Sequence, residues 1–167
     1  MAKEKHAIVR TDNMSGTRDY SLMVSARYYD NDVASEIDNG NIVVLGDFDK
    51  NEREVRKVST PKGTEKLTEL ALVASPELFY DETTHHGFEE FVNEAGKEIT
   101  LYVFHRNDCF SVTAEAFTEV PAKGEYAVLT AGTKMGKSAS KTGTVIGKIA
   151  DIEKVGPDRY YVVQVEM

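Results

Sequence analysis

Ile99-Thr-Leu-Tyr-Val-Phe104 begins a series of five short segments rich in β-branched and aromatic residues. The other four cover residues 109–115, 126–129, 144–149 and 160–165. Turn-forming residues separate them at 106–108, 121–124 and 155–158. Short strands divided by regularly spaced turns are typical of an all-β barrel or sandwich. This half of the chain therefore predicts a mainly β fold.

The first half adds three further segments that indicate strands. The pair Asn39-Gly40 favours a tight turn because these residues readily adopt positive φ, and the β-branched run 42–45 follows it. Residues 53–58 are a weaker strand candidate because their valines are three positions apart. The run 67–74 becomes continuously apolar toward its end, which predicts a strand covered on both faces and ended by Pro76.

One segment, residues 87–95, predicts a short helix of about two turns. Its apolar residues recur at the spacing of one helix face, its glutamates fall on the opposite face, and Gly96 follows as a stop signal. The apolar residues are Phe88, Phe91, Val92 and Ala95, and the acidic ones are Glu89, Glu90 and Glu94.

The chain of 167 residues has the length of a single domain and should bury about 70% of its unfolded surface. Residues 1–30 mix polar and charged residues with two short apolar pieces, which predicts an extended N-terminal arm. We therefore expect an arm over residues 1–30 and one β-rich domain, a β-barrel or sandwich, over residues 31–167.

Composition and charge exclude several classes of protein. The formal net charge of -8 opposes a main role in binding nucleic acid phosphates. No run approaches the ~20 apolar residues of a membrane helix, and no apolar signal core follows the first residues, so we expect a soluble protein without a membrane partner. The single cysteine, Cys109, excludes a disulfide-rich scaffold and indicates synthesis in a reducing compartment.

Residues 131–138, Ala-Gly-Thr-Lys-Met-Gly-Lys-Ser, match a relaxed form of the phosphate-binding loop. A functional loop of this kind opens a helix whose N-terminus completes the anion site. The residues after Ser138 are poor helix formers, and too few follow for the strands of a nucleotide-binding fold. We therefore expect a solvated loop between two strands, and keep a nucleotide-binding enzyme that uses Lys137 as an alternative.

No other group of residues predicts catalysis, a cofactor or a metal. Adjacent histidines in a strand point to opposite faces, so His85 and His86 indicate an exposed loop more than a zinc site. Cys109 lies in a strand-like segment and is expected to be a small packing residue. The carboxylate pairs and tyrosine pairs fit solvated surfaces and half-buried strands: Asp47 and Asp49, Glu89 and Glu90, Tyr28 and Tyr29, Tyr160 and Tyr161. We expect no enzymatic activity.

From Asp30 to the C-terminus the chain resembles small head proteins of tailed phages that are encoded beside the major capsid protein. The resemblance is carried by spaced strings rather than by catalytic residues. They are Asn39-Gly-Asn-Ile-Val-Val-Leu-Gly46, Glu54-Val-Arg-Lys-Val-Ser-Thr-Pro61, Leu70-Ala-Leu-Val-Ala-Ser-Pro-Glu77, Asn107-Asp-Cys-Phe-Ser-Val-Thr-Ala-Glu115, Pro121-Ala-Lys-Gly124, Leu129-Thr-Ala-Gly-Thr-Lys134, Ile146-Gly-Lys-Ile149 and Tyr160-Tyr161-Val162. The family is that of capsid decoration, or cement, proteins of siphophages.

The resemblance implies a virion structural protein that binds the outer surface of the head and stabilises the shell. Its partners would be the major capsid protein and, by analogy with other cement proteins, further copies of itself in a trimer. It would be synthesised in the host cytoplasm and end on the capsid surface. We expect the arm to contact the capsid through Ile8, Val9 and Arg10, ordering as it binds. A tail-tube or neck protein is the alternative structural role.

Overall fold

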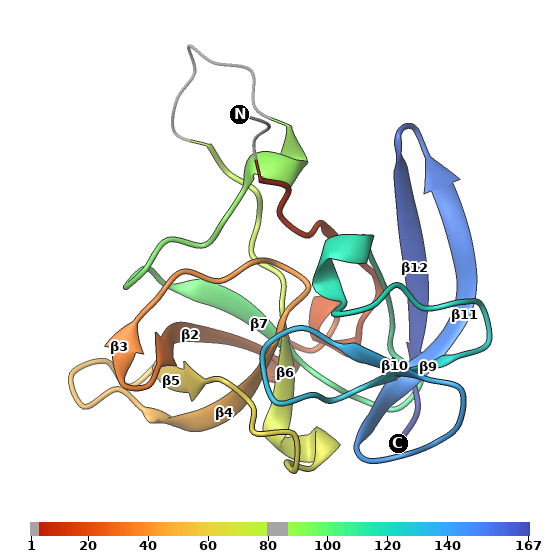
Figure 1. Cartoon of the computed structure of the whole chain (residues 1–167). Coiled ribbons are helices and arrows are strands. Elements are labelled where there is room, and N and C mark those ends of the chain that lie inside the picture. The colour runs from red at the N-terminus through yellow and green to blue at the C-terminus, as the bar shows by residue number, and fades with distance from the viewer. Residues whose placement is uncertain (1–3, 80–86) are drawn as a thin grey trace.

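The computed structural model describes residues 4–79 and 87–167, and a closed five-stranded β-barrel forms one half of it (Figure 1). The sheet order is β3-β2-β5-β4-β6-β7, and pairing of β7 with β2 closes the barrel. The pair β2–β5 is parallel and its other pairs are antiparallel. The strands are β2 (Met23–Asp30), β3 (Val33–Ala34), β4 (Ile42–Phe48), β5 (Val55–Ser59), β6 (Leu70–Val73) and β7 (Ile99–Val103).

An antiparallel six-stranded sheet of order β1-β8-β12-β11-β9-β10 forms the other half. Its longest strands form the β11–β12 hairpin, which rises beside the rest of the molecule in Figure 1. The strands are β1 (Val9–Asn13), β8 (Cys109–Val112), β9 (Tyr126–Val128), β10 (Gly136–Ser138), β11 (Val145–Val155) and β12 (Asp158–Val165).

Strand β6 joins the two halves because both of its faces are buried. Leu70 and Leu72 lie in the larger core, between the barrel and the second sheet, whereas Ala71 and Val73 lie in the smaller core inside the barrel. All four side chains are fully buried, so the alternation of a strand places successive residues in different cores. The prediction of a strand covered on both faces is confirmed here.

The mainly β fold is confirmed, and its only helical segments in the described residues are five single turns of 3-10 helix. They are η1 (Ser15–Thr17), η2 (Tyr20–Leu22), η3 (Leu67–Glu69), η4 (Phe88–Glu90) and η5 (Ala114–Ala116). No helix among the described residues is long and apolar enough to cross a membrane.

The predicted helix over residues 87–95 is limited to the single turn η4. The backbone becomes extended at Phe91, with φ -78° and ψ 131°. Asn93 then pairs with Ile37 through two backbone hydrogen bonds of 3.0 Å. This pairing with a distant segment satisfies backbone groups that a second helical turn would otherwise use, so the helical spacing of the apolar residues does not determine the conformation.

The first 30 residues do not form a separate arm in the described part of the chain. Strand β1 pairs with β8 in the second sheet, and β2 is a barrel strand. Met14, between them, is 1% exposed in the larger core. The Ser15 amide donates a 2.9 Å hydrogen bond to Asp108 Oδ1, which fixes this segment to the β7–β8 turn. The prediction of an extended arm is therefore corrected, because Ile8 and Val9 are buried and the second apolar piece, residues 22–24, leads into the barrel strand β2.

Candidate functional site

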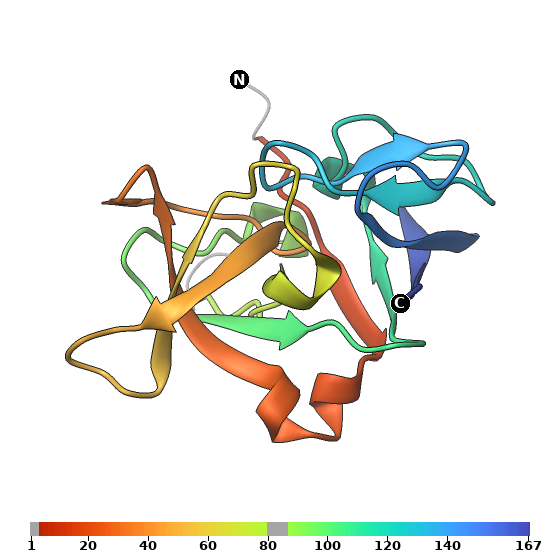
Figure 2. The ribbon, with the colours of Figure 1, turned by 90° about the horizontal axis from the view of Figure 1, so that it is seen from below.

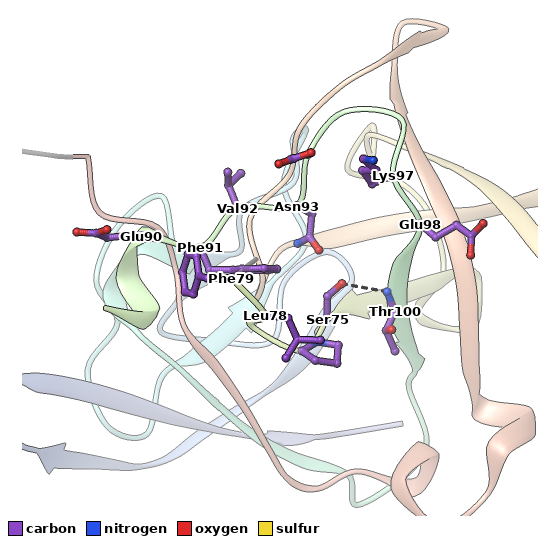
Figure 3. A pocket seen from close by; sticks show the side chains of 12 residues that line it. Ser75, Leu78, Phe79, Glu90, Phe91, Val92, Asn93, Lys97, Glu98 and Thr100 are labelled. Atoms are coloured by element: carbon purple, nitrogen blue, oxygen red, sulfur yellow. Dashed lines mark hydrogen bonds between the residues drawn. The ribbon is translucent and has the colours of Figure 1, made fainter. Parts of the chain in front are cut away.

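A groove with a volume of about 670 Å³ opens at the η4 end of the molecule (Figure 3). One wall is the segment 75–79, which follows β6, and the other is the segment 90–94, which follows η4. Lys97, Glu98 and Thr100, at the start of β7, complete the lining. The described lining residues therefore all come from one stretch of the chain, residues 75–100.

The floor of the groove is apolar and partly aromatic. The rings of Phe79 and Phe91 meet edge to face, with centroids 5.8 Å apart and an interplanar angle of 88°. Figure 3 shows these rings side by side above Leu78. Leu78 is 65% exposed and Val92 is partly exposed. An aliphatic side chain entering the groove would contact both aromatic and aliphatic carbon, the usual lining of a binding pocket.

A buried hydrogen-bond network fixes the two walls to each other. The Asn39 side chain donates to the Ser75 carbonyl at 2.8 Å and accepts from the Ser75 amide at 2.9 Å. The Asn93 side chain donates to Asn39 Oδ1 at 3.1 Å and to the Ile37 carbonyl at 2.9 Å. Satisfied networks of this kind hold buried polar groups in one arrangement. The groove is thus formed before anything binds.

The rim of the groove is acidic. In segments 75–79 and 87–98 the sequence has five glutamates and one lysine. Glu94 and Lys97 are exposed at this rim. Glu98 is also exposed and lies 3.0 Å from the Arg27 guanidinium. The pKa of Arg27 is raised, mainly by its hydrogen bond to Glu52. The negative charge of Glu98 acts in the same direction.

The opposite end of the molecule is basic. Residues 61–66 and 130–148 contain six lysines and one glutamate. A bridge between Lys62 and Ala131 and a hydrogen bond from Thr144 Oγ1 to the Glu65 carbonyl at 2.7 Å bring the two segments together. Figure 1 shows η3, beside the first segment, at the bottom and η4 at the top, and η3 faces the viewer in Figure 2. The chain is therefore polarised, with the acidic groove and the lysines at different ends.

The loop that resembles a phosphate-binding loop lies between β9 and β11, as its sequence predicted, but it is not wholly solvated, because Met135 is fully buried. It follows β9, and its last three residues are β10, which pairs antiparallel with β9. A strand therefore stands where a phosphate-binding loop needs a helix N-terminus. Lys137 Nζ lies 3.6 Å from Glu119 and donates to the Val120 carbonyl at 3.3 Å.

Of the predicted capsid-contact residues, Val9 and Arg10 lie in β1 of the second sheet and Ile8 directly precedes this strand. Ile8 is 6% exposed and Val9 is 9% exposed. Arg10 remains partly exposed, stacks over the Tyr160 ring at 4.9 Å and lies 3.7 Å from Glu153. Two of the three residues thus pack inside the protein, so a contact through them would require β1 to leave its sheet.

The other residues considered for catalysis or metal binding do not form a common site in the described part of the chain. Cys109 is partly buried in β8, and burial, followed by the negative charges of Asp12 and Glu153, raises the pKa of its thiol. His85 and His86 lie outside the described residues. Within residues 4–79 and 87–167, no three histidine, cysteine or acidic side chains gather closely enough to hold a metal ion.

Comparison with known proteins adds no relative. No family model matches the chain, and neither the curated proteins nor the solved structures contain a significant match.

The groove is the feature that sequence reasoning missed. The spacing of Phe91 and Val92 predicts a helix face, and no local pattern connects these two residues to Leu78 and Phe79. One signal was present: aromatic residues 79, 88 and 91 lie close together among glutamates without an alternating strand pattern. Such aromatic residues at the rim of a sheet are candidates for surface binding.

Proposed function

We propose that this protein is a virion structural protein, a decoration or cement protein that binds the outer surface of a phage head and stabilises the shell. Its principal partner is the major capsid protein. Copies of the chain associate with one another on the lattice, and a trimer is the arrangement suggested by analogy.

The single observation that carries this proposal is the set of strings that resembles phage head proteins. Those strings coincide with the framework of both halves of the molecule. Three contribute to β4, β5 and β6 of the barrel, and others contribute to β8, β11 and β12 of the second sheet. The resemblance thus includes strands of both halves, although β2 and β7, which close the barrel, lie outside the quoted strings.

The groove supports the same proposal through its chemistry. A cement protein binds a repeated surface through shape and a modest number of side chains. The groove offers exposed aliphatic carbon at Leu78, an aromatic floor and walls held by the Asn39–Asn93 network. A preformed apolar groove with a charged rim suits the docking of a polypeptide, because little ordering entropy is lost on binding.

Quantitative mass spectrometry of purified phage particles tests the proposal. The copy number of this chain is measured relative to the major capsid protein. A ratio near one, or a simple fraction of it set by lattice symmetry, is the expected result. A few copies per particle would instead indicate a neck or tail protein, and absence from the particle would overturn the structural role.

A further inference from the structure

Two features of the groove restrict what can occupy it. Its floor presents the Phe79 and Phe91 rings and the exposed Leu78 side chain, which favour an aliphatic or aromatic group. Its rim carries the exposed Glu94 and also Glu98, which is paired with Arg27 at 3.0 Å, and Lys97 is the one cation among the described lining residues. A bound segment that carried carboxylates would be repelled, whereas one that carried lysine or arginine would be attracted.

We propose that the groove binds an extended, basic segment of the major capsid protein, with an aliphatic side chain on the aromatic floor and flanking lysines or arginines at the glutamate rim. This inference rests on the proposed function and adds an orientation to it. The groove end faces the shell, and the basic end, with Lys62 and Lys66, faces outward.

An extended segment is favoured over a helix because both walls are themselves extended. Beyond η4, Phe91 is extended and Asn93 forms a β-bridge with Ile37, and the wall at Ser75 lies two residues after the end of β6. The Asn39–Asn93 network holds these walls in place. A segment that lies along them can place alternate side chains on the floor and at the rim.

The net negative charge of the protein, like the glutamates of the groove rim, favours binding of a positively charged partner. The chain carries a formal charge of -8, so its long-range field also attracts a basic surface. Because rim charges are exposed, they should affect the association rate and its salt dependence more than the lifetime of the complex.

The deciding experiment measures binding to heads purified from phage that lack this gene. The groove variant combines Leu78→Asp with Glu94→Lys, both at exposed positions. The matched control combines Lys62→Glu with Lys66→Glu, at exposed positions of the opposite end. We expect the groove variant to bind at least about tenfold more weakly and the control to bind within about twofold of the wild type. Wild-type binding should weaken as salt is raised.

Equal binding by the groove variant and the wild type would overturn the inference while leaving the decoration role intact. Loss of binding in the lysine control alone would overturn the orientation. Melting temperatures of both variants, expected to match the wild type, exclude unfolding as the cause.

If wild-type protein itself does not bind heads, the decoration role fails and the groove is decided separately by NMR titration. The probes are the peptides Lys-Leu-Lys-Val-Lys and Glu-Leu-Glu-Val-Glu, which share their aliphatic residues. We expect the lysine peptide alone to shift the backbone amides of Val92, Asn93 and Glu94. The same shifts with both peptides, or none with either, would refute the proposed chemistry of the groove.

Discussion

Replacing Met14 with alanine should destabilise the protein strongly, although the residue lies in a stretch whose composition indicates a mobile arm. Met14 is 1% exposed and belongs to the core between the barrel and the second sheet. The Met14 carbonyl accepts hydrogen bonds from the Thr17 amide at 3.0 Å and from its hydroxyl at 2.7 Å. The surrounding backbone is therefore held in place and cannot collapse easily into the space that the side chain leaves.

Buried methionine-to-alanine substitutions cost about 2–5 kcal/mol, from lost transfer free energy and from the cavity. For a chain of this size, each kcal/mol of lost stability lowers the melting temperature by about 2–4 °C. A loss near 3 kcal/mol for Met14→Ala therefore lowers it by roughly 6–12 °C. Urea unfolding followed by circular dichroism gives the free energy of unfolding, and calorimetry gives the melting temperature.

Met167→Ala is the matched control, because that side chain is 50% exposed and its loss should change the free energy of unfolding by less than about 0.5 kcal/mol. If Met14→Ala were no more destabilising than Met167→Ala, the segment around Met14 would behave as a free arm in solution. The placement of Met14 in the core beside β1 would then be wrong.

Three further results are expected. Asn93→Ala removes side-chain hydrogen bonds to Ile37 and Asn39 and should cost about 2 kcal/mol in urea unfolding; an unchanged midpoint would contradict the role of the network. Glu65 is subject to partial burial, which alone would raise its pKa, but backbone N–H donors hold that pKa below its ordinary value of 4.5. Its stabilising contribution is therefore complete above pH 4.5 and is lost as the pH falls through the lowered folded value, so acid should destabilise the wild type more than Glu65→Gln; parallel pH–stability curves would refute this. The raised pKa of the Cys109 thiol should make its reaction with a disulfide reagent slower in native protein than in urea, and equal rates in the two states would disprove the assigned environment.

The strands that sequence analysis predicted correctly are those whose pattern is local. The run at residues 70–73 is apolar at each position, and that pattern reflects the two cores that the strand separates. The turn at Asn39-Gly40 also follows from local chemistry, since Gly40 has φ 79°. In these cases the residue and its immediate neighbours determine the conformation.

The predictions that failed depended on partners far away in the chain. Phe91 and Val92 have helical spacing from Phe88, but the pairing of Asn93 with Ile37 extends the backbone there. The groove arises from that same pairing, because it brings one wall beside the other. Ile8 likewise is an isolated apolar residue in the sequence, but in the structure its amide donates a 3.1 Å hydrogen bond to the hydroxyl of Thr113, just after β8 and about a hundred positions later. Long-range contacts of this kind leave no local sequence signal.

The order of the strands has a consequence for synthesis on the ribosome. The barrel uses strands β2 to β7 and so has all of its parts once residue 103 has emerged. Strand β1 precedes them, yet Val9 pairs with Val112, and β8 is then completed on its other edge only by β12, which ends at Val165. Strand β1 is therefore made before the barrel strands but stays without its partner β8 while the barrel closes. A nascent chain from which residues up to about 105 have emerged should hold a protected barrel and an exposed apolar segment at β1, to which a chaperone can bind until β12 is made.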